Sequence, residues 1–190
     1  MEKVFIENIK YDKQDFSLTA LEFGEYQNCE FNTCNFSNSN LAGFNFIDCR
    51  FINCNLSLMS CDKTTLNNCT FLNCKLLGIR FDTCNKFLLS VNFENCLLNL
   101  SSFFQLKLKK TKFLNSSLHE VDFTETDLTQ AVFTNCDLAY AIFDSTNLES
   151  ADLSTANNYS IDIEKNKIKK AKFALTEIGG LLQKYQITIV

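Results

Sequence analysis

The sequence contains no proline and no tryptophan, and only five glycines and one histidine among its 190 residues. Tight hairpin turns rely on glycine and proline, so a chain this poor in both is not built on them. No apolar run approaches the length of a membrane span, and the opening MEKVFIENIKYDKQ is charged throughout, unlike the apolar core of a signal peptide. We therefore expect a soluble, cytoplasmic protein that makes no membrane contact.

What the sequence does contain is a five-residue period. From Asn28 to Leu56 a small residue, a polar residue and then Phe or Leu recur, a spacing that matches neither the period of a strand nor that of a helix. The Phe or Leu positions, called centres below, run from Phe16 to Phe81 and, after a shift of two residues, from Leu88 to Phe173. The 14 units before the shift and 18 after it, 32 in all, leave no room for a second domain.

The residue two positions before most centres is small and is predicted to point inward as well. Cysteines occupy this position at Cys29, Cys49 and Cys69, twenty residues apart, and a second set follows at the same spacing: Cys34, Cys54, Cys74. If four units form one square coil, each set is a buried column in which cysteine acts as a small hydrophobe. Zinc binding is the alternative, but four residues separate neighbouring cysteines and no histidines cluster near them. We expect free thiols in a reducing compartment, with no metal and no cofactor.

Eight such coils, stacked at the strand spacing of about 4.8 Å, predict an all-β rod about 40 Å long. The register breaks near residues 83–90, because Phe81 and Phe93 are 12 residues apart where the period allows 10. Lys86 and Phe87 are expected to be the exposed members of a two-residue bulge. Two interpretations are open: the bulge is a tolerated insertion at a corner, or it is a surface feature that contacts a binding partner.

Charge is segregated along the chain. Residues 113–164 contain ten acidic residues and no lysine or arginine, whereas the rest of the chain carries 12 acidic and 18 basic residues. Units centred at Phe123, Phe143 and Ile163 are expected to share one face, which would carry five carboxylates: Asp122, Glu125, Asp144, Asp162, Glu164. Such a stripe is either an ordinary solvated face or a surface that presents negative charge to a basic groove, as a DNA backbone does.

The two ends depart from the repeat. We expect residues 1–14 to cap the first coil, residues 15–173 to form the β-helix, and residues 174–190 to form a helix, capped by Thr176, and a closing strand from Ile187. This end is more apolar than a cap needs, which predicts a homodimer through Ile178, Leu181, Leu182, Tyr185, Ile187 and Ile189.

Catalysis is not expected. The single histidine, His119, follows a centre and should lie on the surface, and no glycine-rich phosphate loop, nucleophile elbow or paired acid and base appears in the sequence.

Four units show the repeat most clearly: Thr126-Asp-Leu-Thr-Gln130, Cys136-Asp-Leu-Ala-Tyr140, Thr146-Asn-Leu-Glu-Ser150 and Ala151-Asp-Leu-Ser-Thr155. They resemble the A(D/N)LXX motif of the pentapeptide-repeat family, and the resemblance covers most of the chain. It implies a right-handed quadrilateral β-helix of about eight coils with a short C-terminal helix.

Within that family, the ending from Ile168 to Phe173, followed by the apolar helix, looks like the dimerisation module of Qnr-type quinolone-resistance proteins. Those are dimeric mimics of duplex DNA that bind type II topoisomerases. The resemblance implies a non-catalytic homodimer that binds DNA gyrase or topoisomerase IV through its acidic face, does not itself bind nucleic acid, and confers quinolone resistance. Many Qnr proteins carry two longer loops, where this chain has only its bulge. The alternative is a protein-interaction scaffold with an unknown partner.

Overall fold

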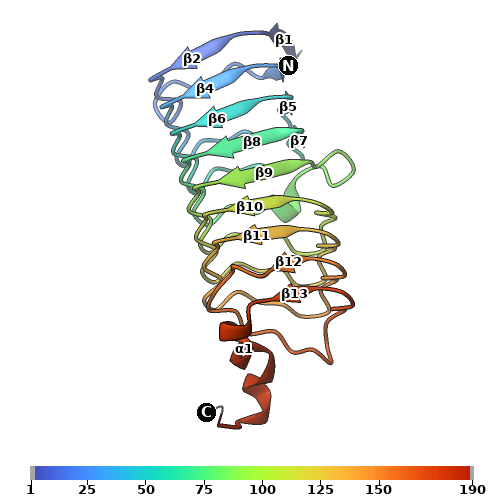
Figure 1. Ribbon diagram of the computed structural model, residues 1–190. Helices are drawn as coiled ribbons and strands as arrows, with labels where there is room; N and C mark the ends of the chain where they lie inside the picture. Colours follow the sequence, from blue (N-terminus) through green and yellow to red (C-terminus); the bar gives the residue numbers. More distant parts are fainter. Residues whose placement is uncertain (1–2, 189–190) are drawn as a thin grey trace.

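A computed structural model describes residues 3–188. Apart from a shift of two residues after residue 83, backbone pairing follows a spacing of twenty residues. Tyr11 pairs with Phe31, and Phe31 with Phe51, in parallel register, so each coil of four units lies directly on the one before it. The coils stack into a four-sided solenoid with the N-terminus at one end and a short helix at the other (Figure 1). This is the all-β repeat architecture that the five-residue period predicts.

Four faces run the length of the solenoid, and we number them in chain order. The first face carries a four-stranded parallel sheet in the order β1 (Val4–Glu7), β3 (Gly24–Gln27), β5 (Asn45–Ile47) and β7 (Thr65–Asn67). The second face carries a nine-stranded parallel sheet of β2 (Lys10–Asp12), β4 (Glu30–Asn32), β6 (Arg50–Ile52), β8 (Cys69–Leu72), β9 (Val91–Glu94), β10 (Lys112–Leu114), β11 (Val132–Thr134), β12 (Asp152–Leu153) and β13 (Lys172–Phe173). The third and fourth faces, which begin with the centres Phe16 and Leu21, pair through isolated bridges.

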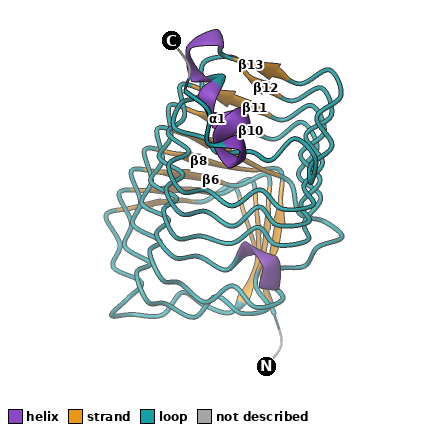
Figure 2. Ribbon diagram, turned by 90° about the horizontal axis from the view of Figure 1, so that it is seen from below, coloured by secondary structure: helices purple, strands orange, loops and turns teal. Residues whose placement is uncertain are grey.

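The core is a set of ladders formed by the centres. On the second face Phe31, Phe51 and Phe71 are at most 1% exposed, and their rings stack on one another at centroid distances of 5.0 Å. The ladder continues through Phe93, Phe113 and Phe133. Each buried Phe contributes about 1.5–3 kcal/mol, and the offset stacking adds to that. The view from below shows the coils lying over one another around this interior (Figure 2).

The corners explain how the chain turns without proline and with few glycines. The residue two positions after most centres is left-handed, and 26 non-glycine residues in the described chain have positive φ. Ten of them are asparagine, the residue that tolerates this conformation best after glycine. Their N–H groups bond to the next coil, as Asn28 does to the Ile47 carbonyl at 2.9 Å.

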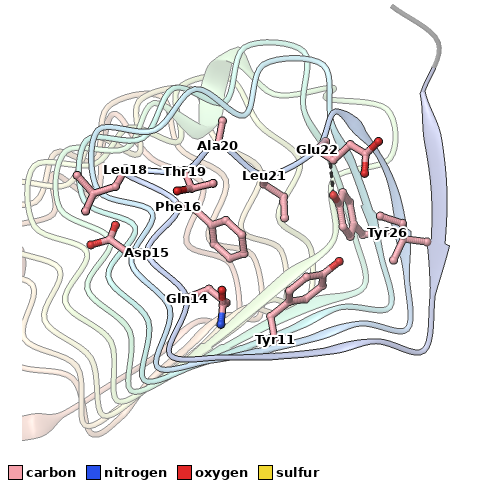
Figure 3. A pocket seen from close by; sticks show the side chains of 11 residues that line it. Tyr11, Gln14, Asp15, Phe16, Leu18, Thr19, Ala20, Leu21, Glu22 and Tyr26 are labelled. Carbon is pink, nitrogen blue, oxygen red and sulfur yellow. Dashed lines mark hydrogen bonds between the residues drawn. The ribbon is translucent and has the colours of Figure 1, made fainter.

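The first coil begins earlier than the sequence analysis placed it. The predicted cap of residues 1–14 contains β1 and β2, which pair with β3 and β4 at the twenty-residue offset, so Ile6 and Tyr11 are centres of the repeat. Both were missed because counting began at Phe16, although they continue its five-residue spacing backward. The described residues of this segment form sides of the first coil and leave its interior open toward the end of the rod (Figure 3).

The bulge lies where the register predicts it. Cys69 pairs with Val91 at an offset of 22 residues, and a loop projects from the rod beside β9 after the short 3-10 helix Phe81–Thr83 (Figure 1). The first-face sheet ends there, because no strand follows β7 on that face within residues 3–188. Leu88, expected to be a centre, is 41% exposed, and Leu89 packs against the core in its place.

The C-terminal segment is shorter in regular structure than predicted. It consists of a 3-10 turn Leu175–Glu177, helix α1 (Gly179–Leu182) and a 3-10 turn Gln183–Tyr185. No side chain caps α1, so the predicted Thr176 cap is absent, and residues 187–188 are not in a strand. Instead the helix is attached through its backbone, since Ile161 N–H donates to the Gly180 carbonyl at 2.9 Å. Among the described residues no helix is long and apolar enough to cross a bilayer.

Candidate partner-binding surface

Three of the predicted acidic residues lie together on the fourth face. Asp122 precedes the buried centre Phe123, Glu125 forms the corner after it, and Asp144 follows Phe143, whose ring stacks on that of Phe123 at 5.3 Å. Because the centres point inward, the residues beside them point outward. The stack therefore holds the three carboxylates on two successive coils of one face.

These carboxylates have only neutral hydrogen-bond partners. Asp122 accepts from the Thr124 N–H at 2.9 Å, Glu125 from Gln105 Nε2 at 2.8 Å, and Asp144 from Ser145 Oγ at 3.1 Å. No ion pair involves any of the three within residues 3–188. Their charge is therefore available to a partner.

The other two predicted acidic residues are already paired within the chain. Lys184 lies 2.8 Å from Asp162 Oδ1 and also contacts Glu164, which accepts a further hydrogen bond from the Tyr185 hydroxyl at 2.8 Å. Hydrogen bonding to Lys184 lowers the pKa of both carboxyl groups. The C-terminal segment thus folds back onto the fourth face and neutralises the last coil of the predicted stripe.

Cations from outside the lysine-free segment reach other acidic residues inside it. Lys109 lies 3.2 Å from Asp127 and Lys172 lies 3.0 Å from Asp152. Burial tends to raise the pKa of Asp127, but hydrogen bonds from Thr129 and Lys109 outweigh it, so the pKa is lowered. The third and fourth faces over residues 96–105, 116–125 and 136–145 contain no lysine or arginine. We call this region the acidic surface; its carboxylates are Glu120, Asp122, Glu125, Asp137 and Asp144.

His119 lies on this surface and contacts Asp137 at 2.6 Å through Nε2. Burial would raise the pKa of Asp137, but hydrogen bonds from His119 and Asn158 hold it below its usual value. The imidazole is thus hydrogen-bonded to a surface carboxylate. Among the described contacts it has no cysteine thiol or serine hydroxyl as a partner.

The bulge residues project as predicted from the sequence. Lys86 is exposed and Phe87 is 92% exposed, with its N–H held by Asn85 Oδ1 at 3.3 Å. They lie on the first face, just past the corner that ends the fourth. The bulge and the acidic surface therefore belong to different faces of the rod.

The predicted dimer residues divide into two groups. Leu181 is 8% exposed and packs into the core of its own solenoid with Ile178 beside it, whereas Leu182 is half-buried and Tyr185 and Ile187 are exposed. Ile189 lies outside the described residues. Leu175, which the sequence analysis did not select, is 84% exposed and extends the apolar area of this end.

A pocket of about 400 Å³ opens at the N-terminal end of the rod (Figure 3). Tyr11, Phe16 and Leu21 face into it, and the Tyr26 hydroxyl donates to the Glu22 carbonyl at 2.6 Å. This is the interior of the first coil seen from its end. It presents aromatic surface and no nucleophile paired with a base.

All ten cysteines are buried and free of disulfides. Cys49 Sγ donates to the Tyr26 carbonyl one coil back at 3.2 Å, and Thr126 Oγ1 makes the equivalent bond to Phe103 at 2.8 Å. Burial raises the pKa of Cys49 and of Cys136 to about 12. Cys49 and Cys136 therefore act as protonated donors in the position that threonine takes elsewhere in the rod.

This architecture is that of a repeat solenoid, and comparison with known families identifies it further. Two family profiles match the sequence: the pentapeptide repeat region over residues 44–123 and pentapeptide repeats over residues 116–154. Together they span more than half of the chain. The chain belongs to the pentapeptide-repeat family. No curated protein sequence matches it significantly.

Solved structures share the fold at low sequence identity. A trypsin-treated variant of QnrB1, a plasmid-mediated fluoroquinolone resistance protein, aligns with a TM-score of 0.73 and 17% identity over 98% of this chain and 92% of its own. HetL, a pentapeptide-repeat protein involved in heterocyst differentiation regulation in the cyanobacterium Nostoc sp. strain PCC 7120, aligns with a TM-score of 0.70 and 16% identity over 90% of this chain and 85% of its own. At such identity the likeness concerns the fold.

Proposed function

We propose that this protein is a non-catalytic mimic of duplex DNA that binds the DNA-binding groove of a type II topoisomerase such as DNA gyrase. The observation that carries the proposal is the acidic surface, where Asp122, Glu125 and Asp144 on two successive coils have only neutral partners in the described chain. A rigid rod with a face of fixed negative charge attracts a groove that is basic because it binds phosphate. The likeness in fold to QnrB1, a fluoroquinolone resistance protein, supports the choice of partner.

The assay is gyrase supercoiling with and without a quinolone. The protein should relieve quinolone inhibition, or inhibit supercoiling itself when in excess. The triple variant Asp122→Lys, Glu125→Lys, Asp144→Lys should lose roughly ten- to a hundredfold in affinity at low salt, because charge complementarity governs such encounters. A matched control reverses three acidic residues on the other faces, Glu7, Glu94 and Glu149, and changes the net charge by the same amount.

If the wild type neither binds gyrase nor changes quinolone inhibition, the mimic proposal fails and a scaffold with another partner is the better account. Equal losses in the triple variant and the control would show that total charge matters and the acidic surface does not.

We further propose that two copies join through the C-terminal ends. Leu175, Tyr185 and Ile187 are exposed there, and the attachment of α1 leaves them free of the solenoid's own core. A dimer would place two acidic surfaces on one long axis. Light scattering should give twice the 21.7 kDa chain mass, and Ile187→Asp should give the single mass while leaving the Leu181 contact intact. A monomeric wild type would contradict the dimer.

A further inference from the structure

Apolar side chains at left-handed corners are confined to one of the four corners of the rod. Of the 26 non-glycine residues with positive φ in the described chain, only Leu58, Leu100 and Tyr140 are apolar or aromatic. All three belong to the column between the third and fourth faces, where Asn38, Gly78 and Glu120 are left-handed too, whereas Leu18 in the first coil and Ser160 in the last are not. Elsewhere the same conformation is given mainly to asparagine and other polar residues.

These positions disfavour the side chains found there. Leucine and tyrosine rarely adopt a left-handed backbone. An apolar side chain that stays exposed to water also contributes no hydrophobic stabilisation to the fold. Leu100 is 62% exposed and Tyr140 is 81% exposed. Asn38 shows that asparagine fits this column. Neither the backbone nor the core therefore accounts for the apolar side chains.

Ile142 lies near Leu100 and Tyr140; it is 51% exposed and pairs with Asp122 in the neighbouring column. Together with Glu120 these residues line a shallow hollow of about 470 Å³. Leu100 and Tyr140 are two coils apart, about 10 Å at the strand spacing. We call Leu100, Tyr140 and Ile142 the apolar edge.

The apolar edge lies within the acidic surface. Glu120 sits in the same corner column between Leu100 and Tyr140, and Asp122 and Asp144 flank Ile142 on the fourth face. No lysine or arginine occurs on the third and fourth faces of these coils, so the charge around the edge is of one sign. A duplex phosphate backbone has no counterpart to exposed leucine, isoleucine and tyrosine side chains.

We propose that the apolar edge and the surrounding carboxylates form one docking surface for a protein segment that carries both basic and apolar side chains. This refines the proposed function, on which it rests for the identity of the natural partner. The carboxylates attract and orient the basic residues, and the apolar edge supplies contact area that salt does not screen. Tyrosine is also the residue type most suited to anchor such a contact.

The test uses two synthetic helical peptides of equal charge, one of lysine and leucine and one of lysine and serine, titrated into the full-length protein. The wild type should bind the lysine-leucine peptide roughly tenfold more tightly, and this preference should persist from about 50 mM to about 500 mM salt. NMR shifts on addition of that peptide should centre on the residues of the apolar edge.

The variant Leu100→Asn, Tyr140→Asn should abolish the preference while keeping the charge-driven binding of both peptides. Asparagine is native at Asn38 in this column, so the variant should fold, as circular dichroism checks. Leu58→Asn removes an equally exposed leucine from the same column outside the acidic surface, and it should change nothing. Equal binding of the two peptides by the wild type, or an equal loss in the Leu58 control, would overturn the proposal, as would shifts centred elsewhere.

Gyrase separates this inference from the proposed function. If gyrase binds the wild type and the Leu100→Asn, Tyr140→Asn variant equally well, the docking inference is wrong and the DNA-mimic function stands. If gyrase binds neither but the peptide preference is present, the mimic function is wrong and the docking surface stands. Sedimentation of each variant should match that of the wild type, since a shift would mean that a second copy occupies the edge.

Discussion

The four coils before the bulge and the coils after it share one core but differ on the outside. Before the bulge both the first and the second faces carry strands. After it the first face is reduced to isolated bridges such as Lys107 with Asp127, and carboxylates without cationic partners gather on the fourth face. The phenylalanine ladder of the second face passes through both regions unchanged.

The comparison shows that inward and outward positions are subject to different physical constraints. The inward positions must fill a narrow interior at constant spacing, so they repeat. The outward positions touch only solvent and neighbouring coils, which leaves their charge free to vary. We therefore propose that the coils after the bulge carry the partner-binding surface.

The largest expected effect tests whether the two regions share one core. Phe51→Ala, before the bulge, and Phe113→Ala, after it, each remove a ring that is at most 1% exposed and stacked on both sides. Each variant should lose about 3–5 kcal/mol of unfolding free energy in urea titrations. A loss in one region more than twice that in the other would mean that the coils do not form one cooperative core.

The two ends can be compared through their glycines. A Cβ on Gly24 would lie 2.5 Å from the Val4 carbonyl oxygen, and one on Gly180 would lie 2.0 Å from that of Tyr159. Gly24→Ala should loosen β1 and Gly180→Ala should detach α1, each at about 1–3 kcal/mol. Hydrogen exchange should rise near residues 4–7 in the first variant and near 175–185 in the second, with the ladder between them still protected.

A smaller effect is expected from exchanging the donors of the two regions. Cys49 and Thr126 make equivalent bonds to a carbonyl one coil back, so Cys49→Thr and Thr126→Cys should each change stability by less than about 1.5 kcal/mol. The ten thiols should stay unreactive toward a disulfide reagent until the protein unfolds. Rapid labelling of the native protein, or a melting temperature lowered by a chelator, would show that the cysteines have another role.

The smallest effect concerns Lys184. Its pairing lowers the pKa of Asp162 and Glu164, so the attachment is present at neutral pH and is lost as the pH falls through those lowered values. NMR signals of Tyr185 should report the release. Lys184→Gln should remove the pH dependence and strengthen the binding of a basic partner slightly, because two more carboxylates become available. Unchanged Tyr185 signals down to pH 3 would contradict the pairing.

The inward residues were predictable from the sequence because each must obey the period. The centres, the cysteine columns and the shift between Phe81 and Phe93 all follow from counting, and Ile6 and Tyr11 could have been found by extending the count backward. Two centres depart from the period: Leu88, where a bulged loop lets Leu89 turn inward in its place, and Asn158, which is exposed and left-handed while Tyr159 is buried.

The surface was predictable only in part. Asp122, Glu125 and Asp144 could be placed on one face by the period, but the pairing of Asp162 and Glu164 depends on how the C-terminal segment folds back, and no period describes that. The apolar edge was missed because it is recognised by the left-handed backbone at Leu100 and Tyr140, which the sequence does not reveal. Tyr140 resembles any surface tyrosine until its left-handed φ and its neighbours Leu100 and Glu120 are known.

The central claim is that the acidic surface occupies the place of DNA on its partner. The most direct measurement follows fluorescently labelled protein bound to purified gyrase while unlabelled duplex DNA is added. The account predicts that DNA displaces the protein competitively, and that the Asp122→Lys, Glu125→Lys, Asp144→Lys variant binds too weakly to be displaced. A stable complex of gyrase with both the protein and DNA at saturating concentrations would contradict it.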